Sequence, residues 1–154
     1  MLIASCSFDD SFNLKLLDDF KSFKNVVENN SENIKGEYFD IADDYHWITE
    51  SNFENLFQFT TPDFRNRFQT LFKNKEITKI KVWDKKCIQF RIRPDHNNSL
   101  LKSEWNELWI IYNSGCDCKC QNEINEIKVL DKNIEEIEKN WYKVISTNKR
   151  YIGG

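Results

Sequence analysis

The chain has 154 residues, which fits one domain and is long enough to bury a core of its own. Its 12 Phe, five Trp and five Tyr recur along the chain with branched residues, which argues against disorder, and only four Gly and two Pro argue against a loop-rich repeat. The net charge of −3 argues against general nucleic-acid binding, and no apolar run is long enough to span a bilayer.

The first ten residues place a cysteine in a distinctive context. Ile3-Ala4-Ser5 puts a branched apolar residue and two small residues before Cys6, and Asp9 and Asp10 follow soon after. This segment resembles the lipobox of bacterial lipoproteins, in which the Cys is lipidated after signal cleavage. The resemblance implies an exported surface lipoprotein whose membrane contact is made through a lipid on Cys6.

The segment also departs from the lipoprotein pattern. Only five residues precede Cys6, none of them Lys or Arg, whereas a secretory signal needs a basic region and about 7–15 apolar residues. Either Met1 is a misassigned start within a longer signal, or residues 2–4 are an ordinary apolar segment and Cys6 is a small buried residue of a cytoplasmic protein. We therefore divide the chain into an N-terminal segment (1–10), a single α+β domain (11–150) and a tail (151–154).

Residues 11–29 predict an amphipathic helix. Large apolar residues recur there at spacings of three and four, which places them on one helix face. The stripe consists of Phe12, Leu16, Phe20, Phe23 and Val27, broadened by Leu14, Leu17 and Val26. We expect Asp9, Asp10 or Ser11 to cap the start of this helix, and the polar residues after position 29 to end it.

A second helical region is expected before the middle of the chain, after a short strand at 37–41 and an ambiguous stretch at 42–50. Residues 52–59 predict a short helix. Thr61 and Pro62 then form a stronger start signal, because Thr caps a helix and Pro suits its first position. The stripe that follows, ending near position 75, contains Phe64, Phe68, Leu71 and Phe72.

Residues 77–93 are the best strand signal in the sequence. Two runs that alternate apolar and polar residues flank Asp84-Lys85-Lys86, which predicts an antiparallel hairpin with a three-residue link. Pairing Val82 with Ile88 and Ile80 with Phe90 matches the apolar faces. This register places Lys79 opposite Arg91.

The outer face of this hairpin is a candidate ligand-binding surface. Its residues are Lys79, Lys81, Trp83, Arg91 and Arg93, together with Gln89. Like charges directly opposite each other are unfavourable, so we expect either a carboxylate on a neighbouring strand or an anionic partner to offset them. The alternative is a solvated face whose lysines discourage edge-to-edge aggregation.

Further strands are expected toward the C-terminus. Residues 107–113 are apolar on both faces in their middle, which suits a central strand covered by helices. Residues 124–130 predict another strand. Residues 134–138 and 141–146 predict a last hairpin turning at Lys139-Asn140, with a helix over 133–142 as the alternative. The order of helices followed by strands predicts an α+β fold, with an antiparallel sheet of about four to six strands packed by N-terminal helices.

The most unusual local feature is a cluster of three thiols. In an extended chain Cys116, Cys118 and Cys120 project to one side and are candidate zinc ligands. Cys87, His96 or His46 would supply the fourth ligand. The cluster lacks the usual two spaced pairs of a structural zinc site, so a disulfide with Cys87 and three unpaired thiols both remain alternatives.

Motifs for catalysis are weak. His46 follows Asp43-Asp44-Tyr45 and His96 follows Asp95, and either suits an acid/base pair, but the sequence contains no nucleophile-elbow or phosphate-loop motif. We therefore expect a non-enzymatic binding or interaction protein with no cofactor, whose partner is a protein or an anionic ligand. The alternative is a small enzyme or zinc-binding protein that uses the thiol cluster.

Overall fold

A computed structural model describes residues 11–30, 46–84, 87–94, 104–115 and 134–149. Within these residues the helices are α1 (Leu16–Asn29), α3 (Glu50–Leu56) and α4 (Pro62–Lys73). The strands are β1 (His46–Ile48), β2 (Lys79–Asp84), β3 (Cys87–Pro94), β4 (Glu104–Asn113), β5 (Ile134–Glu138) and β6 (Trp141–Lys149).

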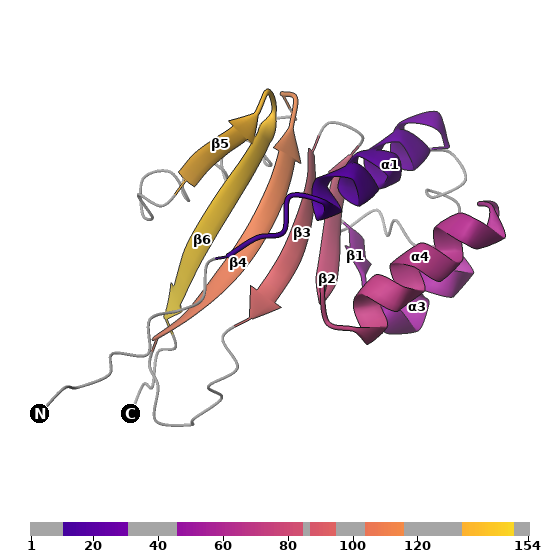
Figure 1. Ribbon diagram of the computed structural model, residues 1–154, viewed down its shortest axis with the longest axis horizontal. Helices are drawn as coiled ribbons and strands as arrows, with labels where there is room; N and C mark the ends of the chain where they lie inside the picture. The colour runs from indigo at the N-terminus through magenta and orange to yellow at the C-terminus, as the bar shows by residue number, and fades with distance from the viewer. Residues whose placement is uncertain (1–10, 31–45, 85–86, 95–103, 116–133, 150–154) are drawn as a thin grey trace, which may run out of the picture.

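The described strands form one antiparallel six-stranded sheet in the order β1-β2-β3-β4-β6-β5. Figure 1 shows α1, α3 and α4 together on one side of this sheet. The predicted α+β fold is confirmed, and the helices are N-terminal as expected, although β1 precedes α3 and α4. The sheet follows the sequence order except that β6 lies between β4 and β5, which leaves β5 at the edge.

The first helix begins later than the sequence predicts. α1 starts at Leu16 after two turn-like bonds, from the Leu16 amide to the Asn13 carbonyl and from the Leu17 amide to the Leu14 carbonyl. The Asn13 side chain accepts a hydrogen bond from the Lys15 amide at 3.1 Å, and such local bonding competes with helix formation. The expected cap at Ser11 is therefore wrong, and Leu14 is 63% exposed instead of broadening the apolar stripe.

The two short helices have well-defined ends. The Thr49 and Asn52 side chains form a reciprocal capping box at the start of α3. At α4 the predicted cap is confirmed, because the Thr61 hydroxyl accepts from the Phe64 amide at 3.3 Å. This helix ends in a Schellman motif: Lys75 has a φ of 59°, its amide bonds to the Phe72 carbonyl, and the next amide bonds to the Leu71 carbonyl.

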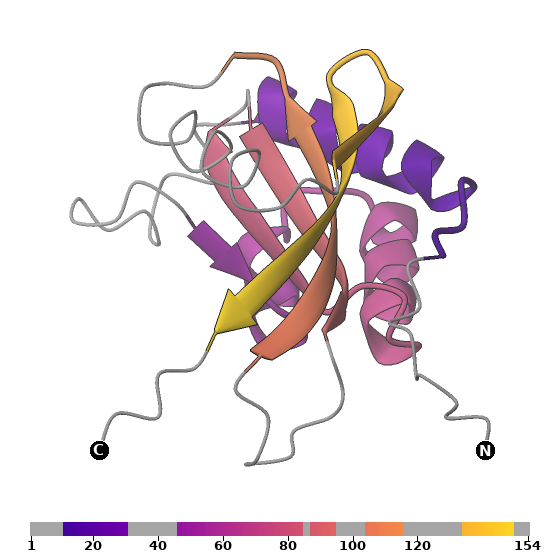
Figure 2. The same cartoon turned by 90° about the vertical axis from the view of Figure 1, so that its left-hand side faces the viewer.

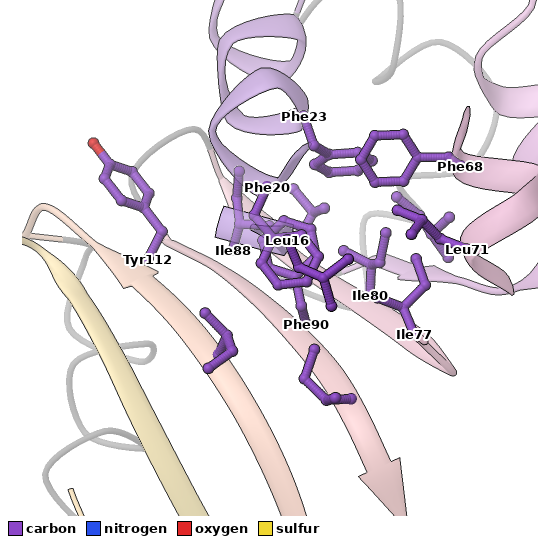
Figure 3. Close-up of a cluster of buried hydrophobic side chains, with 14 of the residues drawn as sticks. Leu16, Phe20, Phe23, Phe68, Leu71, Ile77, Ile80, Ile88, Phe90 and Tyr112 are labelled. Atoms are coloured by element: carbon purple, nitrogen blue, oxygen red, sulfur yellow. The ribbon is translucent and has the colours of Figure 1, made fainter. Parts of the chain in front are cut away.

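The helices and the inner sheet face share one hydrophobic core (Figure 3). Phe20 of α1 stacks on Phe90 of β3 with ring centroids 4.1 Å apart, and Phe23 contacts both Phe90 and Phe68 of α4. All four rings are at most 1% exposed. Because one cluster joins every helix to the sheet, the described residues form a single folded unit.

The hairpin register is confirmed. Val82 pairs with Ile88, Ile80 with Phe90, and Lys79 with Arg91. The link is shorter than predicted, because Asp84 belongs to β2 and pairs with Cys87, which leaves two residues between the strands. A register shift between positions 82 and 84 accommodates this tighter connection next to Trp83.

The C-terminal hairpin is also confirmed, with β5 and β6 turning at Lys139-Asn140. Asn140 has a φ of 69°, which a turn between strands requires and a helix does not allow, so the alternative helix over 133–142 is wrong. β4 is a central strand of the sheet, as expected, and the described helices cover one of its faces. An antiparallel sheet needs no crossover helices on its other face.

Several predictions lie outside the described residues: the strands at 37–41 and 124–130, Cys6, the thiols Cys116, Cys118 and Cys120, His96 and the tail. Among the helices that the structure describes, none combines the length and the apolar character that crossing a bilayer requires.

Candidate basic-aromatic interaction face

Strand alternation places a set of cations and indoles on the sheet face turned away from the helices. Trp47 of β1 pairs with Lys81 of β2, and Lys79 of β2 pairs with Arg91 of β3, which in turn pairs with Trp109 of β4. Their chain neighbours, such as Ile80 and Phe90, point into the core. Figure 2 shows the four strands that carry the set side by side in front of the helices. We call Trp47, Lys79, Lys81, Trp83, Arg91 and Trp109 the basic-aromatic face.

The ammonium groups of the two lysines of this face lie over indole rings. The Lys79 Nζ lies 4.0 Å from the ring centroid of Trp47. The Lys81 Nζ lies 5.2 Å from the same ring and 4.5 Å from that of Trp83. Lys81 is only 7% exposed, so its ammonium group is ordered between the two indoles at a distance where the ring quadrupole attracts a cation.

Glu107 of β4 supplies the carboxylate that the hairpin's like charges require. Arg91 Nη1 lies 3.3 Å from Glu107 Oε1, and Trp109 Nε1 donates to Glu107 Oε2 at 3.1 Å. Arg91 Nε also donates to Thr78 Oγ1 at 2.9 Å. The side chains of Arg91 and Glu107 are 24% and 14% exposed, so this ion pair is largely shielded from water. It fixes both the guanidinium group and the Trp109 ring.

Lys79 is the more exposed of the two lysines, and its pKa is lowered by its surroundings. Burial lowers the pKa of Lys79, and the neighbouring cations Arg91 and Lys81 lower it further, whereas Glu107 acts in the opposite direction. At Lys79, burial and these two cations therefore outweigh the opposite effect of Glu107.

An apolar zone adjoins the basic-aromatic face on the same side of the sheet. Cys87, Ile111 and Val144 are buried there, packed by half-buried neighbours that include Trp83 and Trp109. Cys87 is fully buried, and the Gln89 amide lies 3.9 Å from its Sγ. Trp83 and Trp109 thus contact both the charged residues and this apolar zone. Packing against the apolar zone restricts the rotamers of the two indoles.

The structure brings together most of the candidate ligand-binding residues. Lys79, Lys81, Trp83 and Arg91 lie on the predicted face, and the backbone of Arg93 continues β3 opposite Leu108. The sequence alone did not place Trp47, Trp109 and Glu107 on this face. The alternation of Glu107 and Trp109 along β4 was the available signal, but it became informative only once β4 was known to pair with β3.

The described residues do not bear on the predicted zinc site at the thiol cluster. Among the residues that the structure describes, no group of three or more His, Cys, Asp and Glu side chains is placed to hold a metal ion. The thiol cluster lies outside them, and β1 contains the backbone of His46. The zinc site therefore stays a prediction from the sequence.

Comparison with known proteins adds no family assignment: no family model, no curated protein and no solved structure matches this chain. The functional argument rests on the chemistry of the site alone.

Proposed function

We propose that this chain is a non-enzymatic binding protein and that its basic-aromatic face binds an anionic partner. One observation carries the proposal. Two lysine ammonium groups lie around the Trp47 indole, beside Arg91, whose guanidinium group pairs with Glu107. Cations that are already ordered lose less side-chain entropy when an anion binds.

The position of the charges supports binding more than plain solubility. Exposed lysines that only keep a protein soluble point into water and remain mobile. Here Lys81 is buried, Lys79 is half-buried, and both contact indoles. Lys79 has Arg91 and Lys81 beside it, and these cations help to lower its pKa, so we expect attraction for an anion to be strongest there.

Retention on immobilised heparin, a general polyanion, tests the proposal. The double variant K79Q/K81Q should elute at lower salt than the wild type, because cations that contact a polyanion release counterions. The matched control is K73Q/K75Q, which removes two exposed lysines at the same spacing from the end of α4. Because Lys81 is buried, K79Q is measured as well, with circular dichroism to verify folding. Equal elution of all four proteins would refute the proposal.

The lipobox-like segment supports a proposal about where this binding takes place. We propose that Cys6 carries a lipid, which would hold the chain at a bacterial membrane surface. One acyl chain alone gives only marginal membrane binding, so further anchoring would be needed. The genomic sequence upstream of Met1 tests this point. An in-frame apolar segment is expected, and a stop codon close before Met1 would contradict the proposal.

A further inference from the structure

We infer that Lys79 is a modification site for carbon dioxide, at which its amine adds to CO2 and forms a carbamate beside Arg91. This inference goes beyond the proposed function, because it concerns a covalent change to the basic-aromatic face and not the partner of that face. It does not require Lys81 to react. Lys81 is buried between the Trp47 and Trp83 indoles, so it is not the reacting amine.

The Lys79 amine is positioned by an indole and is not used by a stronger interaction. Its Nζ lies 4.0 Å from the ring centroid of Trp47, and its side chain is half-buried, so part of it reaches solvent. Among the residues that the structure describes, none forms an ion pair or a hydrogen bond with this Nζ. A small uncharged molecule such as CO2 can therefore react there without displacing either kind of bond.

The surroundings of Lys79 favour the neutral form of its amine, which is the form that attacks carbon. Lysines become nucleophiles when burial or a neighbouring cation lowers their pKa. Burial is the largest cause of the lowered pKa of Lys79 and the Arg91 guanidinium is the next, while Glu107 opposes both and Lys81 adds to them. Strand pairing places Arg91 directly opposite Lys79, so the geometry agrees with the direction of the shift.

The same cations favour the product. The neutral amine nitrogen bonds to the CO2 carbon, one C–O π bond becomes an oxygen lone pair, and the nitrogen releases one proton to water. The carbamate carries one negative charge. Burial disfavours both the ammonium and the carbamate, but Arg91 repels the first and attracts the second. Its Nε donates to Thr78 and its Nη1 pairs with Glu107, and its Nη2 makes no hydrogen bond to a described residue, so Nη2 remains as a donor for the carbamate.

NMR of the full chain in isotope-labelled bicarbonate, which equilibrates with CO2, tests the inference. We expect a carbamate carbon signal that is lost in K79Q and kept in K73Q/K75Q, which removes two exposed lysines near the end of α4. Because the N-terminal amine also reacts with CO2, alkylation of the carbamate followed by mass spectrometry identifies the modified residue. No signal lost in K79Q, or trapping on Lys73 and Lys75 as extensive as on Lys79, would overturn the inference.

The part assigned to Arg91 has its own test. R91Q should reduce the carbamate signal of Lys79, because it removes the charge that disfavours the ammonium and favours the carbamate. An unchanged signal in folded R91Q would refute this part. If R91Q does not fold because Glu107 loses its partner, the K79Q comparison and the trapping experiment decide the inference.

Heparin retention separates this inference from the proposed function. The carbamate replaces a positive charge of the basic-aromatic face by a negative one, which weakens its attraction for anions. At equal pH and ionic strength, bicarbonate should therefore lower the salt concentration at which the wild type elutes, but not that for K79Q. An equal decrease in both proteins would contradict this effect of the carbamate. If no protein binds heparin, the proposed function fails, while the carbamate signal still decides the inference.

Discussion

The two faces of the sheet are built on different physical principles. The inner face is covered by α1, α3 and α4 and filled with phenylalanines such as Phe20, Phe23 and Phe90, which are fully buried. The outer face between β1 and β4 holds lysines against indoles and an arginine against one glutamate. The inner face gains stability in proportion to the apolar area that it removes from water. The outer face retains charge at a cost, which is typical of a surface that interacts with something else.

The largest effect should come from the inner face. Phe90→Ala removes a ring that contacts Phe20, Phe23 and Trp141, so we expect a loss of about 3–5 kcal/mol in the free energy of unfolding. Urea denaturation measures it. Leu14→Ala, at an exposed position, should change stability by less than about 0.5 kcal/mol. If the two variants lost the same amount, the inner face would not be the main source of stability.

A smaller loss should follow from separating the charges of the outer face. Glu107→Gln leaves Arg91 half-buried without its carboxylate, so we expect a destabilisation of about 1–3 kcal/mol. Glu136→Gln, at an exposed position on β5, is the control and should be nearly neutral. The same urea titrations report both. Equal stability of the two variants would contradict a stabilising role of the Arg91–Glu107 pair.

The pH dependence of stability should reveal the energetic cost of keeping Lys79 charged on the outer face. Burial and the nearby cations Arg91 and Lys81 lower the pKa of Lys79 below its ordinary value of 10.5. Between the lowered pKa and 10.5 the unfolded chain binds more protons at this site than the folded chain, so stability rises with pH there. The charged form is the destabilising one. It is present at neutral pH, and its cost disappears as pH rises toward 10.5.

Lys79→Gln removes this titration. Urea denaturation between about pH 7 and pH 10 should therefore show the wild type gaining stability relative to K79Q as pH rises, by less than about 1 kcal/mol because Lys79 is only half-buried. K73Q, an exposed variant on α4, should follow the wild type throughout. If the difference in the free energy of unfolding between wild type and K79Q did not change with pH, the lowered pKa of Lys79 would be contradicted.

The smallest effect should come from a position on neither face. Lys75 holds a φ of 59° in the Schellman motif after α4, a conformation that glycine adopts more easily than lysine. Lys75→Gly should therefore raise the melting temperature, with a gain of about 0.5–1 kcal/mol. Lys73→Gly, inside the last turn of the same helix, should lower it by a similar amount. Loss of stability in both variants would contradict the role of this turn.

Much of the fold was readable from local patterns. The Phe stripes of α1 and α4, the cap at Thr61 and the turns of both hairpins act over a few residues, and each predicted the correct element. The β2–β3 register followed from matching apolar faces, since a shift by one residue would have exposed Ile80 and Phe90. The start of α1 was misjudged because the local bonding of Asn13 competes with a helix that the apolar stripe alone would have extended.

The candidate site was only half predictable. The sequence by itself determined that Lys79, Lys81 and Arg91 share a face and that opposite placement of Lys79 and Arg91 requires compensation, because strand alternation is a local property. Which groups compensate was decided by tertiary structure alone. Trp47 and Glu107 reach the lysines and the arginine only because β1 and β4 pair on either side of the hairpin, and no pattern within a strand specifies its neighbours.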